Sequence, residues 1–185
     1  MSRTYLALLH YDGGGFAGWQ RQPQGRTVQA EMEAVLEQLN ERRIVAHGAG
    51  RTDAGVHAKG LGVSFTVPDR WNATQLHRAL NALLPQDCWI ERLSPMQPGF
   101  HARRSATGRR YRYDIGTDAA SASPFRRPYE WALGRSLDLA AMQRAAAKRC
   151  YKMTLSSNMK REPAHAFYDG LGFRRHGLSF WVDLG

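Results

Sequence analysis

A strand and the turn that follows it open the chain: RTYLALLHYDGGG, residues 3–15. The apolar run has the length of a buried strand, and the glycine-rich turn ends it. A helix is predicted next, over 28–40, because Thr27 can cap its first turn and apolar side chains recur on one face. Those side chains are Val28, Met32, Val35, Leu36 and Leu39. A strand followed directly by an amphipathic helix favours a mixed fold.

Further elements follow in the same alternation. We expect strands at 43–47, 61–67, 88–93 and 109–116, with a second helix that Asn72 caps and Pro85 stops. The order is then strand–helix–strand–strand–helix–strand. It predicts an α+β fold of the ferredoxin-like split β-α-β type, an antiparallel sheet with its helices on one face.

The pattern changes beyond residue 116. Residues 117–135 have loop composition and a helix is expected after Asp138, so 117–147 is expected to be a linker and the start of a further domain. A short β-α-β tail is expected from strand 151–155, helix 163–170 and strand 178–184. Three of the four lysines lie in residues 148–185, whereas 1–147 is almost purely arginine in its basic residues. We therefore predict three parts, 1–116, 117–147 and 148–185.

Composition limits the class of protein. With 43% hydrophobic and 23% charged residues among 185, the chain is of ordinary globular type. No apolar stretch approaches the length of a membrane span, and the start lacks a secretory cleavage site, so a cytoplasmic protein is expected. Two cysteines without a CxxC pattern exclude a disulfide scaffold and a zinc ribbon. A net charge of +10 points to polyanions, first nucleic acid and then anionic lipid.

The segment richest in chemistry is GAGRTDAGVHA, residues 48–58. One carboxylate, Asp53, stands among small residues, with Arg51 and His57 as candidate anion contacts. Glycines let a backbone approach a ligand closely, but Asp beside Gly is also a common turn former. A phosphate-cradling loop is a further alternative, although GxxxxGK[ST] is absent. Spacing alone leaves these alternatives open.

An arginine-rich stretch follows the second strand–helix–strand set. It interleaves basic and aromatic residues: Arg103, Arg104, Arg109, Arg110, Tyr111, Arg112 and Tyr113. Such interleaving suits phosphate contacts and base stacking, while a solvated strand surface is the plainer interpretation.

Five motifs in order resemble the tRNA pseudouridine synthase A (TruA) family, over about residues 3–146. They are YDGGGFAGWQRQ (11–22), RTVQ (26–29), GRTDAGVHA (50–58), FHAR (100–103) and SATGRRYRY (105–113). The resemblance implies isomerisation of uridine to pseudouridine in tRNA, without cofactor or metal, by a homodimer.

The same resemblance implies roles for individual residues. Asp53 aligns with the catalytic carboxylate, Tyr111 with the aromatic residue that stacks near the target uracil, and Arg51 with a residue that helps to extrude the base. Arg109 and Arg110 are the neighbouring candidates for substrate binding. A carboxylate can act as nucleophile or as base in this chemistry.

A second resemblance covers CYKMTLSSNMKREPAHAFYDGLGF, residues 150–173, which is similar to the end of a GCN5-related N-acetyltransferase (GNAT). It implies that Asn158 lies near the pantetheine arm of acetyl-CoA and that Tyr168 is the general acid. Because the TruA-like motifs stop before residue 147 and that family is longer, we expect a truncated synthase fused to this tail. The alternatives are an RNA-binding remnant without turnover and an acetyltransferase.

Overall fold

The computed structural model describes residues 2–138, 152–156, 174–176 and 179–183. The chain divides into two compact units, Met1–Tyr111 and Arg112–Gly185, which are described separately here. Among the described residues, no helix is long and apolar enough to cross a membrane.

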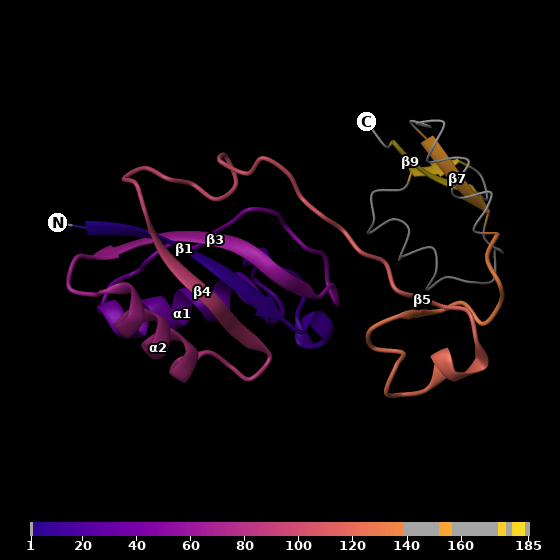
Figure 1. The fold of residues 1–185 in the computed structure, drawn as a ribbon, viewed down its shortest axis with the longest axis horizontal. Helices are drawn as coiled ribbons and strands as arrows, with labels where there is room; N and C mark the ends of the chain where they lie inside the picture. Colours follow the sequence, from indigo (N-terminus) through magenta and orange to yellow (C-terminus); the bar gives the residue numbers. More distant parts are fainter. Residues whose placement is uncertain (1, 139–151, 157–173, 177–178, 184–185) are drawn as a thin grey trace. The chain divides into compact units, whose positions relative to one another are not determined.

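The first unit is a four-stranded sheet with two helices on one of its faces (Figure 1). In chain order its elements are β1 (Ser2–Tyr11), the short 3-10 turn η1 (Gly13–Gly15), α1 (Val28–Asn40), β2 (His47–Gly48), β3 (Ala58–Pro68), α2 (Ala73–Leu83) and β4 (Cys88–Met96). The strands lie in the order β2-β3-β1-β4, and all neighbours are antiparallel. The predicted α+β class and its antiparallel sheet with two helices are confirmed.

Side-chain caps define where both helices begin. Thr27 accepts a hydrogen bond from the amide of Ala30, and Asn72 accepts one from the amide of Gln75 at 2.8 Å. These bonds satisfy amide groups that have no partner inside the helix. The two predicted helices are therefore confirmed to within two residues at each end.

The core lies between the sheet and the helices. In β1 the side chains of Tyr5, Ala7 and Leu9 alternate inward and are fully buried, as the period of two in a strand requires. Apolar side chains of α1, α2, β3 and β4 complete the cluster, among them Met32, Leu36, Phe65, Leu76, Leu80 and Ile90. This core holds both ends of the loop between β2 and β3.

The second unit contains two small sheets. β5 (Ile115–Gly116) pairs in parallel with β6 (Trp131–Ala132), and a 3-10 turn, η2 (Ala119–Ala122), lies between them in the chain. β7 (Lys152–Ser156), β8 (Arg174–His176) and β9 (Ser179–Asp183) form an antiparallel sheet in the order β7-β9-β8. The helices predicted after Asp138 and over 163–170 lie outside the described residues.

Two strand predictions were wrong in extent. Only Ile115–Gly116 of the strand expected at 109–116 pairs with another strand, and the strand expected at 43–47 is reduced to His47–Gly48. The alternation of Arg and Tyr over 109–114 has the period of a strand, but a strand also needs a hydrogen-bonded neighbour. Tyr111 and Tyr113 are instead 66% and 54% exposed.

Candidate functional site

The loop that joins β2 to β3 presents Asp53 to solvent. Asp53 begins a turn in which the amide of Val56 donates to its carbonyl at 3.2 Å, and Gly55 takes up a positive φ of 78°. Within the described part of the chain, no hydrogen bond or ion pair engages the Asp53 carboxylate. The carboxylate is thus accessible to a ligand from outside.

Hydrogen bonds hold this loop against the segment that follows β1, residues 12–19, which is called the turn from here on. The amide of Trp19 donates to the carbonyl of Thr52 at 3.0 Å, and the amide of Gly55 donates to the carbonyl of Phe16 at 3.2 Å. The hydroxyls of Tyr11 and Thr52 are 2.8 Å apart. Burial raises the pKa of Tyr11 to about 12, so its phenol stays neutral at physiological pH. The residues on both sides of Asp53 are therefore anchored, through the backbone of Phe16 and Trp19 and the side chain of Tyr11, to residues of the core.

Two glycines allow the turn and the loop to touch through their backbones. A Cβ at Gly13 would lie 2.2 Å from the carbonyl oxygen of Val56. At Gly18, whose φ is +100°, a Cβ would lie 2.7 Å from the carbonyl oxygen of Thr52. Any larger residue at either position must push the loop away.

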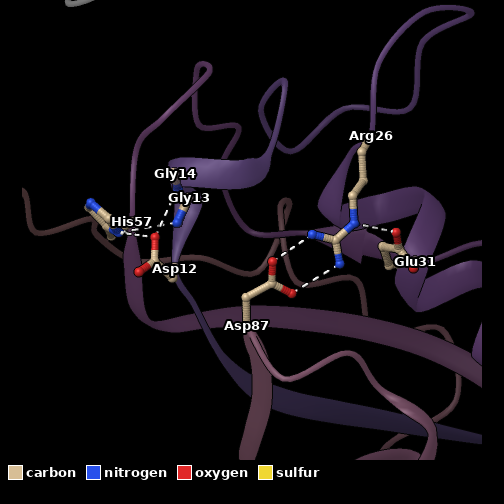
Figure 2. A network of polar contacts seen from close by, with 7 residues as sticks. All are labelled: Asp12, Gly13, Gly14, Arg26, Glu31, His57 and Asp87. Carbon is tan, nitrogen blue, oxygen red and sulfur yellow. Dashed lines mark hydrogen bonds and ion pairs between the residues drawn. The ribbon is translucent and has the colours of Figure 1, made fainter. Parts of the chain in front are cut away.

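A polar cluster joins the end of the loop to the same turn (Figure 2). Asp12 accepts from the amide of Gly14 at 2.9 Å, and its carboxylate lies 3.1 Å from Nδ1 of His57. The amide of Gly13 lies 3.1 Å from the same ring nitrogen. His57, a candidate anion contact on sequence grounds, is thus engaged with the protein itself.

A second part of this cluster fixes the turn to α1 and to the start of β4 (Figure 2). Arg26 forms a bidentate pair with Asp87, at 2.5 and 3.0 Å, and its Nε donates to Glu31 at 2.6 Å. Its guanidinium also lies 4.2 Å from the centre of the Phe16 ring. The amide of Asp12 donates to the carbonyl of Asp87 at 2.9 Å, which connects the two parts.

Of the predicted substrate-binding residues, Arg109 contacts the loop directly. Its Nε and Nη2 both donate to the carbonyl of Ala49, at 3.0 and 2.8 Å. Arg51 is exposed and lines a pocket beside β2. Arg110 and Tyr111 are exposed and have no hydrogen bond or ion pair to any residue the structure describes. The roles assigned to these four residues and to Asp53 stay predictions, and Asn158 and Tyr168 lie outside the described residues.

The pocket beside β2, hereafter the β2 pocket, was not predicted. Its volume is about 460 Å³, and its lining includes Trp19, His47, Arg51, His101, Arg103 and Arg104. Sequence spacing identifies the motif that contains His101 and Arg103, but it gives no sign that the ring of His47 stacks on that of His101, with 4.5 Å between the ring centres. No group of three or more His, Cys, Asp or Glu side chains able to hold a metal ion occurs among the residues described.

Comparisons with known proteins find one family that this chain resembles over a stretch that includes the loop. Residues 7–103 match the family described as tRNA pseudouridine synthase. A tRNA pseudouridine synthase A from Solidesulfovibrio magneticus is 44% identical over 150 residues, which are 79% of this chain and 54% of that protein. One from Thermotoga neapolitana is 41% identical over 145 residues, 78% of this chain and 59% of that protein. The chain therefore spans a little over half the length of these relatives.

A longer match bears on the tail. The tRNA pseudouridine synthase A from Thermosipho melanesiensis is 38% identical over 171 residues, which cover 90% of this chain and 69% of that protein. A match of that extent passes residue 148 wherever it begins, so it includes part of the segment that resembles an acetyltransferase. The comparisons thus give no support to a separate acetyltransferase tail. From residues 7–103 and from these relatives, the chain belongs to the tRNA pseudouridine synthase family.

Proposed function

We propose that this chain isomerises uridine to pseudouridine in tRNA, with Asp53 as the catalytic carboxylate. The observation that carries the proposal is the position of Asp53: it is exposed on an anchored loop that lies inside the residues matched to the family. A catalytic group needs both accessibility and a fixed position. The hydrogen bonds to the backbone of Thr52 and Gly55 fix the position of the loop that carries Asp53.

The reaction is an isomerisation, so it needs no second substrate. The glycosidic bond from the ribose to N1 of uracil breaks, the base turns, and C5 of uracil bonds to the ribose carbon in its place. The hydrogen on C5 leaves as a proton, and N1 gains a proton, so the product is an isomer of the substrate. Asp53 acts either as the nucleophile or as the base in this sequence.

The substrate must also be bound and its uridine exposed. Arg51 is two residues from Asp53, and Arg109 is bonded to the same loop, so both are positioned to contact RNA phosphates near the reacting nucleotide. Tyr111 offers an exposed ring for a base that has left its stack. The net charge of +10 favours association with any part of the RNA backbone.

RNA binding without turnover is the second candidate. It is favoured by one observation, that the chain spans only 54% and 59% of two of its relatives. Residues that complete a synthase active site can lie in the part of those proteins that has no counterpart in this chain.

The deciding experiment measures tritium release from tRNA that carries tritium at C5 of its uracils. We expect release by the parent chain and none by Asp53→Ala or Asp53→Asn, with tRNA binding retained in both variants. The Asn variant keeps the shape of the side chain, so its loss of release would depend on the carboxylate itself. Bound tRNA without release by the parent would overturn the catalytic proposal and leave the second candidate.

Two narrower predictions are tested separately. Sedimentation of the chain with and without tRNA tests the homodimer. Protection by acetyl-CoA in a thermal melt would be expected only if the tail binds that cofactor, as the resemblance at Asn158 and Tyr168 implies.

A further inference from the structure

Two histidines from distant parts of the chain stack at the edge of the sheet. His47 lies on the edge strand β2, and its ring centre is 4.5 Å from that of His101, with 26° between the ring planes. The pairing of His47 with Ser64 places these two residues side by side across the strands. The hydroxyl of Ser64 accepts from the buried amide of Ala102 at 2.9 Å, which fixes the segment that carries His101. The stack is therefore part of the fold.

Cationic side chains surround this stack. Arg51, Arg103 and Arg104 line the β2 pocket with the two histidines. A neighbouring hollow of about 340 Å³ also has His47 in its wall, together with Arg42 and Arg43. The linings of both hollows contain no carboxylate, and these five arginines have no ion pair with any residue in the described part of the chain.

The carboxylate of Glu33, which influences the pKa of His47, already takes part in hydrogen bonds within the protein. Glu33 is buried and takes part in hydrogen bonds with Arg21 at 3.0 Å, with Gln29 at 3.0 Å and with the amide of Ala46 at 3.2 Å. Burial lowers the pKa of His47 first, and the neighbouring His101 lowers it further. Glu33 opposes them by raising it, and Arg104 adds a smaller lowering effect, so the net effect favours the neutral imidazole of His47.

We propose that the β2 pocket binds a backbone phosphate of the RNA substrate, with His47, His101, Arg103 and Arg104 as its ligands, and that His47 takes up a proton on binding. This inference rests on the proposed function, because it assumes that RNA is the substrate. Arg51 lines the pocket and is two residues from Asp53, so the phosphate would belong to the same RNA segment as the reacting uridine.

Proton uptake makes the affinity depend on pH with a definite sign. A phosphodiester keeps one negative charge across this range, so the dependence comes from the protein. The groups that face the pair are Arg42, Arg43, Arg51, Arg103 and Arg104, which stay charged, and Glu33, which is held by its hydrogen bonds. Affinity for RNA should therefore rise about tenfold as the pH falls from about 7.5 to about 5.5.

The test measures binding of an unmodified tRNA transcript to the full chain at several pH values and salt concentrations. We expect Arg103→Ala and Arg104→Ala each to raise Kd about tenfold and to reduce the dependence of log Kd on log salt by about one ion. His47→Asn should flatten the pH dependence. Arg78→Ala is the matched control, because Arg78 is an exposed arginine on α2, outside both hollows, and should leave binding unchanged.

Each result has one interpretation. The phosphate-site inference would be overturned, with the proposed catalysis unaffected, by either of two results. One is that Arg103→Ala and Arg104→Ala bind tRNA like Arg78→Ala, and the other is that a folded His47→Asn keeps the full pH dependence of the parent. If a thermal melt shows that His47→Asn does not fold, the binding measured for Arg103→Ala and Arg104→Ala tests the inference in its place. Parent chain that binds tRNA without tritium release would overturn the proposed catalysis and leave this pocket standing, whereas no binding by the parent would overturn both.

Discussion

The contact between Gly13 and Val56 makes Gly13→Ala the most informative single substitution. The φ of Gly13 is not in the left-handed region, so alanine meets no backbone strain there and acts through its methyl group alone. That methyl would lie 2.2 Å from the carbonyl oxygen of Val56 and 2.9 Å from the carbonyl carbon of Gly55. Both atoms belong to the loop that carries Asp53.

The size of the effect follows from the distance. Contacts of a Cβ below 3.0 Å are essentially never seen, so the loop must move by about 0.8 Å to relieve the clash. Overpacking of this kind costs about 1–3 kcal/mol of folding free energy. For a unit of this size, we expect the melting temperature to fall by about 5–15 °C. A displacement of about 1 Å at a catalytic group lowers a rate by about a hundredfold.

The assay pairs a thermal melt with single-turnover tritium release. Gly15→Ala is the matched control, because it adds the same methyl group in the same turn, where the nearest atoms are 3.6 and 3.7 Å away. It should melt and react like the parent. Equal melting temperatures for the two variants would refute the steric argument, and an unchanged rate in a destabilised Gly13→Ala would refute the link between loop position and catalysis.

Three further predictions concern the stability of the first unit. Glu33→Ala removes the acceptor for three hydrogen bonds in a buried setting and should cost about 2–4 kcal/mol by urea unfolding, with Glu33→Gln less harmful. Asn81→Ala should cost about 2 kcal/mol, because the Asn81 side chain bonds both the amide and the carbonyl of buried Ile90, each at 2.8 Å; a cost below 0.5 kcal/mol would contradict this role. Burial raises the pKa values of Tyr11 and Cys88 to about 12 in the folded protein. Because the unfolded chain loses these protons at a lower pH, the free energy of unfolding should be constant below about pH 9 and fall between about pH 9 and 12. Urea midpoints measured across this range should fall less steeply in Tyr11→Phe.

Much of the first unit could be predicted from sequence because its determinants are local. Thr27 and Asn72 mark helix starts by a hydrogen bond that spans three residues, and the periodicity of the following apolar residues identifies the buried face. The stretch 109–114 shows the opposite case. Its alternation suits a strand, but pairing depends on a neighbour that no local pattern reveals.

The candidate site likewise contains features that the sequence predicts and features that only the fold reveals. The loop around Asp53 was identified because its motif is contiguous in sequence. Its anchors to Tyr11 and Trp19, and the stack of His47 on His101, join residues more than thirty positions apart. Such contacts depend on the order and register of the strands, which become known only with the fold.

The bonds between the turn and the loop also have a consequence for local unfolding. The amide of Trp19 is bonded to the loop, and the amide of Gly55 is bonded to the turn, so neither can exchange its hydrogen with solvent unless the two segments separate. Amides in residues 13–19 and 52–55 should therefore exchange together, as one cooperative unit. Phe16 and Trp19 of that unit are buried, and its Thr52 is hydrogen-bonded to the buried Tyr11, so the exposed loop is held rigid by the core beneath it.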